Sequence, residues 1–273
     1  MLKDVTIGQY YPTGSVIHKL DPRTKILFTT AFVVMLFFLN NLWGYLATFV
    51  ILATITLLSK IPIGYIIRGI KGLVLIIMLT VVLNLFMTPG TVVATLGPLS
   101  VTLEGLKVAS FMALRLIFLV IGTSIMTLTT SPIDLTDGME WCMRYIPFVR
   151  RYAHELAMMM SIALRFIPTL MEETERIMKA QKARGANFET GSIIARAKNL
   201  IPILIPLFIS AFRRADELAT AMEARCYRGG ENRTRMKQLS FEFWDGTSLV
   251  LMVMMIVGLY LTTLIQIPLV FPI

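Results

Sequence analysis

The chain carries two matching stretches, Glu172-Glu-Thr-Glu-Arg-Ile-Met-Lys-Ala-Gln-Lys-Ala-Arg-Gly185 and Arg213-Arg-Ala-Asp-Glu-Leu-Ala-Thr-Ala-Met-Glu-Ala-Arg-Cys226, which are offset by 41 residues. Each contains an acidic pair, and an aliphatic residue and a terminal Ala-Arg recur in step. The repeat decides the fold of this region, because it predicts two long charged helices that end in the same way.

Helix signals support both predictions. Glu172 with Arg176 and Glu175 with Lys179 have the (i, i+4) spacing, acid first, that stabilises a helix. A glycine is expected where a helix ends in a left-handed cap. Such glycines follow both Ala-Arg pairs, at Gly185, Gly229 and Gly230.

The composition is that of a membrane protein. Of the 273 residues, 56% are hydrophobic and 16% are charged, and the mean hydropathy is +0.72. A soluble domain is less apolar and carries more charge. The net charge of +9 could suggest a nucleic-acid binder, but such proteins concentrate basic residues on a soluble face without long apolar runs. We therefore expect the chain to lie in the lipid bilayer and to bind no nucleic acid.

Apolar runs predict an all-α integral membrane protein with about five transmembrane helices, because about 20 residues cross a ~30 Å hydrocarbon core. The polar segment Gly8–Lys25 precedes them and is expected at the membrane surface. The expected crossings are Ile26–Trp43, Gly44–Leu58, Leu73–Met87, Lys107–Leu128 and Thr247–Ile273.

The distribution of Lys and Arg predicts the orientation, because cytoplasmic loops are enriched in both. Four precede the first crossing and three lie between the second and third, whereas the turn between the first and second has none. The N-terminus is therefore expected in the cytoplasm, and the last crossing would carry the C-terminus outside.

Charge is concentrated between the fourth and the last crossing. Residues 131–245 hold 17 of the 26 Lys and Arg and 14 of the 17 Asp and Glu. We therefore divide the chain into a surface segment with four crossings (1–130), a cytoplasmic helical region with both Ala-Arg signatures (131–246) and a last crossing (247–273).

Two apolar stretches within the cytoplasmic region, Leu156–Met171 and Asn199–Phe212, are too short to span comfortably. We interpret them as the membrane-facing ends of two amphipathic helices that begin at the bilayer boundary and run into the cytoplasm. Hydropathy alone leaves additional crossings open as an alternative.

The two terminal arginines are candidates for protein docking. One arginine at the end of a helix usually serves the helix dipole and the free carbonyls. Here two occur on matched helices, and each follows a small alanine that lets another surface approach. A guanidinium makes planar, bidentate contacts with carboxylates. The predicted docking residues are Ala183, Arg184, Gly185, Ala224, Arg225 and Cys226.

Four motifs also resemble a known family: Ser15-Val-Ile-His-Lys-Leu-Asp-Pro-Arg-Thr-Lys25, Ala183-Arg-Gly185, Glu223-Ala-Arg-Cys-Tyr-Arg-Gly-Gly230 and Arg233-Thr-Arg-Met236. Over nearly its whole length the chain is similar to the transmembrane T component (EcfT-like coupling subunit) of energy-coupling factor transporters. These are vitamin and metal-ion uptake systems driven by ABC-type ATPases. In that family each Ala-Arg-Gly signature ends a coupling helix, and its arginine enters a groove on one of two ATPase subunits.

The resemblance implies that Arg184 meets one ATPase and Arg225 the other, with Cys226 standing where the family has Gly. It implies a non-catalytic subunit in the cell membrane of a prokaryote, which transmits the motion of two ATPase subunits to a substrate-binding S component. The chain has no Gly-rich Lys-Ser/Thr phosphate loop. We expect no cofactor or metal, because His18 and His154 belong to no recognisable metal or catalytic set.

Two further features bear on the S component. Met158, Met159 and Met160 are adaptable side chains of the kind used at promiscuous surfaces. They either accept several S components in turn, as in the shared type of the family, or fill gaps between helices. Arg115 lies within the fourth crossing, where a charge costs ~2.5–3.5 kcal/mol. Its partner is Asn84, a backbone carbonyl or the S component.

Alternative functions stay open. A pore-lining ABC permease would need polar residues on several crossings, whereas only Asn84 and Arg115 stand out. A dedicated cobalt or nickel T component is the alternative to the shared, vitamin-transporting type. An integral membrane enzyme would need clustered His, Asp or Glu near the membrane face, and the acidic residues here are spread along helices instead.

Overall fold

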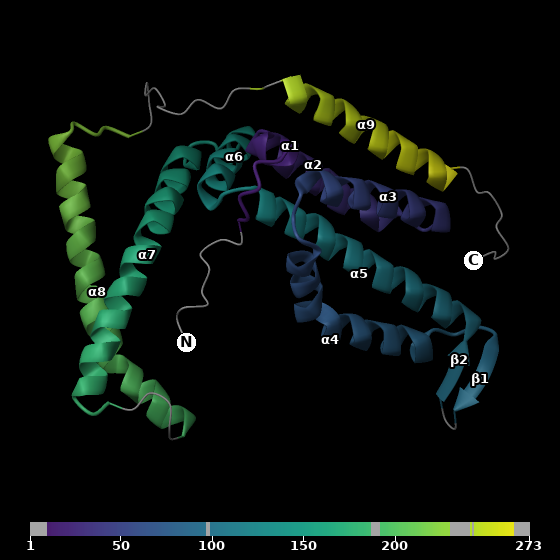
Figure 1. Cartoon of the computed structure of the whole chain (residues 1–273), viewed down its shortest axis with the longest axis horizontal. Coiled ribbons are helices and arrows are strands. Elements are labelled where there is room, and N and C mark those ends of the chain that lie inside the picture. The colour runs from purple at the N-terminus through teal and green to yellow at the C-terminus, as the bar shows by residue number, and fades with distance from the viewer. Residues whose placement is uncertain (1–9, 97–98, 187–191, 230–240, 242, 265–273) are drawn as a thin grey trace. The chain divides into compact units, whose positions relative to one another are not determined.

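The computed structural model describes residues 10–96, 99–186, 192–229, 241 and 243–264. It is built almost entirely of helices, which confirms the all-α prediction (Figure 1). The described residues form two compact units, one within 8–138 and 239–273 and the other within 139–238. The elements are α1 Val16–Lys19, α2 Pro22–Phe38, α3 Leu42–Ser59, α4 Ile63–Met87, β1 Val92–Leu96, β2 Leu99–Thr102, α5 Leu103–Thr129, α6 Pro132–Tyr145, α7 Ala153–Ala183, α8 Ile193–Ala224 and α9 Phe243–Leu264.

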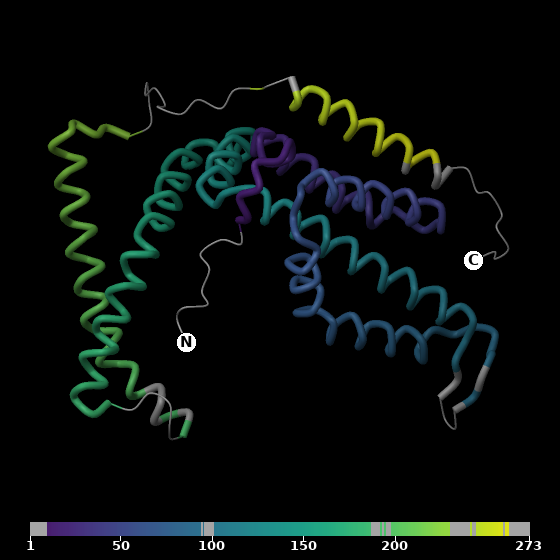
Figure 2. The backbone as a smooth tube through the Cα atoms, viewed as in Figure 1, coloured from purple at the N-terminus to yellow at the C-terminus, as the bar shows by residue number. Residues whose placement is uncertain are grey.

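The first unit has an apolar core shared by α2, α3, α5 and α9, whose traces run alongside one another in Figure 2. Tyr45 of α3 stacks on Phe111 of α5, with the ring centroids 5.2 Å apart. The outward side chains are also apolar, as a surface in contact with lipid requires. The buried core residues include Phe32, Leu36, Tyr45, Leu52, Phe118, Ile125, Leu128 and Met255.

All five predicted crossings correspond to helices. Among the described residues, α3, α4 and α5 are long and apolar enough to cross a membrane. The helix α2 has 17 residues, and the apolar part of α9, Trp244–Gly258, is also short. The chain is thus a multi-pass membrane protein. The last part of the predicted crossing 247–273 lies outside the described residues.

The third crossing begins earlier than predicted. The helix α4 starts at Ile63, so Arg68 and Lys71 lie on the helix and not in a loop. The connection from α3 is a tight turn in which Lys60 is left-handed, with φ of 54°. The sequence prediction began the crossing only after the last of these charged residues. Long basic side chains can extend toward water from within a helix, so the charges did not mark its start. Arg68 does so across the ring of Tyr65, with its guanidinium carbon 5.3 Å from the ring centroid.

The loop between the third and fourth crossings contains a hairpin that the sequence did not predict. The strands β1 and β2 pair antiparallel, with Val92 opposite Thr102. The carboxylate of Glu104, at the start of α5, accepts a hydrogen bond of 2.7 Å from the backbone N–H of Thr91. The strands are four and five residues long, too short for an alternating pattern to stand out from the adjoining apolar runs.

The N-terminal motif is packed into the helix ends of the first unit. The Nζ of Lys25 donates to the carbonyl oxygens of His18 and Thr129, at 3.1 and 2.9 Å. The backbone N–H of Asp21 donates to Oδ1 of the buried Asp245, at 2.7 Å. The motif therefore connects the start of α2 with the end of α5 and the start of α9.

The second unit is dominated by α7 and α8, which cross each other (Figure 1). The chain reverses between them, so their C-terminal ends point to opposite sides of the crossing. The helices α7 and α8 therefore run in opposite directions, and that both begin at the bilayer boundary stays a prediction. Figure 1 also shows a bend in α8, which contains Pro202 and Pro206.

The predicted pairs Glu172–Arg176 and Glu175–Lys179 are not among the ion pairs within 4.0 Å in the described part of α7. Their neighbour Glu173 pairs across the crossing instead, with its carboxylate 3.9 Å from the guanidinium of Arg214 on α8. Exposed (i, i+4) pairs gain little over solvation, so these long side chains are free to extend into water.

Candidate docking surfaces

The first Ala-Arg signature is a regular helix end. Arg184 caps α7, and its backbone N–H donates to the carbonyl oxygen of Ala180 at 3.2 Å. Gly185 takes the left-handed conformation, with φ of 87°. The N–H of Ala186 then bonds to Gln181 O at 3.0 Å, and that of Gly185 bonds to Lys182 O at 3.0 Å. This is the Schellman motif, in which two N–H groups beyond the helix satisfy its last carbonyls.

The second signature ends α8 with the same hydrogen bonds. The N–H of Tyr227 donates to Met222 O at 3.0 Å, and that of Cys226 donates to Glu223 O at 2.8 Å. Cys226 occupies the left-handed position with φ of 56°. The 41-residue sequence repeat is therefore also a structural repeat, and Cys226 fills the backbone role that Gly185 fills in the first copy.

Both signatures face solvent. The exposed residues are Ala183, Arg184, Gly185, Ala224, Arg225 and Cys226. Within the described ranges, neither Arg184 nor Arg225 has an acidic partner within 4.0 Å. Each guanidinium therefore keeps its planar set of N–H donors for a carboxylate outside the chain. The six predicted docking residues thus form two separate, accessible helix ends.

The crossing point places the two helix ends far apart. Glu173 and Arg214, which meet at 3.9 Å, each precede the terminal arginine of their own helix by eleven residues. At 1.5 Å of rise per residue, each arginine lies about 16 Å along its helix from the crossing. Because the ends point to opposite sides, Arg184 and Arg225 are separated by up to about 33 Å.

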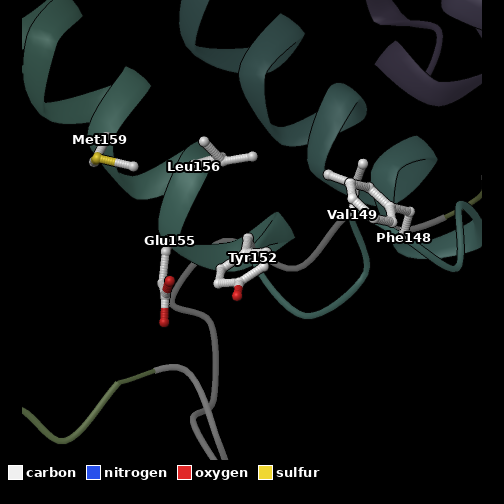
Figure 3. Close-up of a pocket in the computed structure, with 6 residues that line it drawn as sticks. All are labelled: Phe148, Val149, Tyr152, Glu155, Leu156 and Met159. Carbon is white, nitrogen blue, oxygen red and sulfur yellow. The ribbon is translucent and has the colours of Figure 1, made fainter.

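The methionine triplet is only partly a surface. Met159 is 55% exposed, whereas Met158 and Met160 are half-buried. Consecutive residues of a helix point about 100° apart, so three neighbours cannot share one face. Met159 lines a shallow apolar pocket with Phe148, Val149, Tyr152, Glu155 and Leu156 (Figure 3). Sequence reasoning found the methionines but not the aromatic residues of the preceding loop.

Arg115 has a partner within the chain. Its guanidinium donates to the carbonyl oxygen of Leu39 at 2.9 Å and to Oδ1 of Asn40 at 3.4 Å. It also lies over the ring of Phe37, 5.8 Å from the centroid. Arg115 thus caps the C-terminal end of α2, and its partner is a backbone carbonyl, one of the three partners that the sequence left open. Asn84 instead donates to Thr80 O within its own helix, at 2.8 Å.

Comparison with known proteins identifies the family. A family model described as cobalt transport protein (CbiQ) matches residues 13–236. The energy-coupling factor transporter transmembrane protein EcfT of Thermosediminibacter oceani is 58% identical over 257 residues, which cover 94% of this chain and 97% of the relative. The chain belongs to the EcfT family. The EcfT proteins of Clostridium kluyveri and Listeria innocua are 56% and 45% identical, over 90% and 92% of this chain and 92% and 95% of their own lengths.

These relatives confirm the resemblance inferred from the four motifs. The chain is the transmembrane component of an energy-coupling factor transporter, and the EcfT relatives carry that role in their names. The family match includes both Ala-Arg helix ends and the whole of the N-terminal motif. The chain's docking residues can therefore be interpreted within an EcfT subunit.

Proposed function

We propose that this EcfT-family chain couples two ABC-type ATPase subunits to a substrate-binding S component, and that Arg184 and Arg225 each dock into one ATPase. One observation carries the proposal. The two helix ends have the same backbone motif and the same exposed Ala-Arg, yet point to opposite sides of the crossing. Two like ends up to about 33 Å apart suit two separate but related partners.

In this mechanism the crossed helices transmit motion. Nucleotide binding and hydrolysis move the ATPases, the helix ends move with them, and the crossing passes the displacement to the S component. The sequence has no Gly-rich Lys-Ser/Thr phosphate loop, which agrees with a mechanical contribution of this chain. An N-terminus in the cytoplasm puts the basic region 131–246 on the ATPase side, in agreement with the enrichment of Lys and Arg there.

In this proposal the S component binds and selects the transported substrate. We propose that the substrate is a micronutrient of the vitamin class and that the chain is a T component of the shared type. A dedicated cobalt or nickel transporter is the second candidate, because the matching family model is described as a cobalt transport protein. Uptake assays with one T component and two different vitamin S components separate the two. Support of both S components favours the shared type, and support of neither favours the dedicated one.

A pore-lining permease is a weaker candidate. Its substrate path would use the polar side chains of the crossings, but Arg115 donates to Leu39 O and to Oδ1 of Asn40, and Asn84 donates to Thr80 O within its own helix. These hydrogen bonds hold both side chains against the chain's own helices.

Co-purification tests the docking proposal. Arg184→Glu and Arg225→Glu, singly and together, are compared with the parent for retention of both ATPases and for ATP-driven uptake. Arg176→Glu and Arg213→Glu are matched controls, because both are exposed arginines on the same helices away from the ends. We expect the controls to retain both ATPases and the double variant to retain neither. Retention of both by the double variant, with undiminished uptake, would refute the docking role.

A further inference from the structure

The segment between α6 and α7 has an unusual surface. It consists of Tyr145-Ile-Pro-Phe-Val-Arg-Arg-Tyr152, in which apolar and aromatic residues flank two adjacent arginines. Phe148 is 91% exposed and Tyr145 is 70% exposed. Exposing a phenylalanine side chain to water to this extent is unfavourable, so the segment is suited to an environment with less water.

The backbone of this segment is largely satisfied internally. The N–H groups of Val149 and Arg150 both donate to Ile146 O, at 3.1 and 2.9 Å, and that of Tyr152 donates to Val149 O at 2.9 Å. Pro147 has no N–H to satisfy. A compact turn of this kind can enter a region of low water content at small cost, because few of its backbone donors lose a water partner.

Its side chains offer both apolar and cationic contacts. Figure 3 shows Phe148 and Val149 of the turn together with Leu156 and Met159 of α7 around the apolar pocket. The pocket has a volume of about 320 Å³. The carboxylate of Glu155 points away from Phe148 and Val149 (Figure 3).

The charge around the pocket is mainly positive. Arg144 is paired with Glu140 at 2.8 Å. Arg150 and Arg151 are both exposed, and no described acidic side chain lies within 4.0 Å of either. Glu155 is the one acidic residue between 144 and 155. Two cations beside exposed aromatic rings therefore lack an internal counter-charge in the described part of the chain.

Chain connectivity limits how far the segment can lie from the end of α5. The helix α5 ends at Thr129, and α6 begins at Pro132 after a two-residue link. The 14 residues of α6 extend over about 21 Å, so the turn lies within reach of the membrane surface at which α5 ends. Trp141 and Tyr145 stand one helical turn apart on α6, with ring centroids 4.7 Å apart. Such aromatic pairs are typical of the membrane interface.

We propose that residues 145–152 form an interfacial anchor, in which Phe148 and Tyr152 enter the headgroup region and Arg150 and Arg151 bind anionic phospholipid headgroups. Hydrocarbon from the same lipids fills the pocket between Phe148 and Met159. The anchor holds the start of α7 at the bilayer surface and leaves its Arg184 end free to move. This surface is separate from the two helix ends that carry the proposed ATPase contacts.

Spin labelling of the full chain in nanodiscs tests the anchor. The chain has two cysteines, Cys142 and Cys226, so Cys142→Ala with Cys226→Gly gives a background for single labels. Phe148→Cys and Ile146→Cys carry the nitroxide, and Lys179→Cys on the exposed face of α7 is the control. Collision with oxygen, which partitions into lipid, is compared with collision with a water-soluble nickel chelate. The nanodiscs contain either phosphatidylglycerol or only phosphatidylcholine, and no S component is present.

We expect the labels at 148 and 146 to lie about 5–10 Å below the headgroups in phosphatidylglycerol discs, while the label at 179 stays in water. Arg150→Gln with Arg151→Gln should make the label at 148 shallower in phosphatidylglycerol and leave it unchanged in phosphatidylcholine. Equal nickel collision at 148 and 179 would overturn the anchor. Protection that arises only after the S component is added would assign the surface to a protein. Depth that changes neither with lipid charge nor with the Gln pair would overturn headgroup binding.

Discussion

Glu173 of α7 and Arg214 of α8 lie 3.9 Å apart at the crossing, each eleven residues before the arginine that ends its own helix. The crossing therefore divides both helices at equivalent points of the sequence repeat. A displacement of either end is transmitted through the same lever length, about 16 Å. Under the proposed docking, this equality would give the two ATPases equivalent mechanical access to the crossing.

A charge exchange tests the contribution of this ion pair. Both side chains are about one-third exposed, and exposed pairs contribute about 0.2–1 kcal/mol. We expect Glu173→Arg and Arg214→Glu each to lower the melting temperature slightly, and the double exchange to restore most of the loss. The control is Arg213→Ala, which removes a more exposed pair within α8 alone. If the double variant loses more stability than the two single variants lose together, the two side chains do not pair directly.

Cys226 provides a test of the second helix end. A non-glycine residue in the left-handed conformation destabilises the folded chain by about 1–2 kcal/mol. Glycine avoids this cost, but its larger loss of backbone entropy on folding offsets about 0.5–1 kcal/mol of the gain. We expect Cys226→Gly to slow hydrogen exchange at the Tyr227 amide modestly. Cys226→Val should accelerate it, because a β-branched residue tolerates this conformation poorly. Exchange that is the same in all three chains would mean that Cys226 carries no strain.

Gly185 gives the reciprocal test in the first copy. Its φ is 87°, and a Cβ there would meet no other atom within 4 Å. The cost of Gly185→Ala is therefore conformational and not steric, about 1 kcal/mol. We expect faster exchange at the Ala186 amide with an otherwise unchanged fold. Exchange as slow as in the parent would contradict the left-handed cap.

Arg115 is expected to stabilise the fold regardless of the transported substrate. Its removal leaves the carbonyl oxygen of Leu39 with one donor, the hydroxyl of Tyr45 at 3.3 Å. We expect Arg115→Met to lower stability by about 1.5–3 kcal/mol, the usual range for a charged hydrogen bond. Tyr45→Phe should cost less, because it removes a neutral bond. If Arg115→Met is as stable as the parent but loses one S component, the residue is an S-component contact instead.

His18 predicts a pH dependence of the N-terminal segment. Burial lowers its pKa below the usual value, and Nδ1 and Nε2 lie 2.7 Å from Ser15 Oγ and 2.8 Å from Tyr11 O. The neutral ring, with its proton on Nε2, satisfies both contacts. Because the unfolded segment binds the proton more readily, stability is complete above the unfolded pKa of about 6.5 and falls as the pH drops below it. Amide exchange near residue 18 should accelerate from pH 7.5 to pH 5, and His18→Asn should remove most of the change.

The sequence predicted the helix ends well because their determinants are local. A cap needs only the residues within one turn, so Ala183-Arg184-Gly185 could be located from its glycine. The second copy could be located from the repeat, but its left-handed cap position is Cys226 and not the predicted Gly229 or Gly230. The apolar crossings were also visible, because a span is a continuous run. Charges misled the prediction at α4, where Arg68 and Lys71 lie within the helix.

Long-range contacts could not be predicted in the same way. The partner of Arg115 is Leu39 O, 76 residues away, and a backbone carbonyl leaves no mark on the sequence. The antiparallel crossing of α7 and α8 depends on the short connection between them, and identical amphipathic patterns are compatible with either direction. The loop around Phe148 escaped notice because its aromatic residues follow no helical period.

The number of ATPase subunits bound per chain tests the central claim most directly. Native mass spectrometry of the detergent-solubilised complex can count them for the parent, Arg184→Glu, Arg225→Glu and the double variant. Both arginines are exposed, so their replacement should change stability by no more than about 0.5 kcal/mol. We predict two ATPases on the parent, one on each single variant and none on the double variant. Two ATPases on the double variant would contradict docking through Arg184 and Arg225.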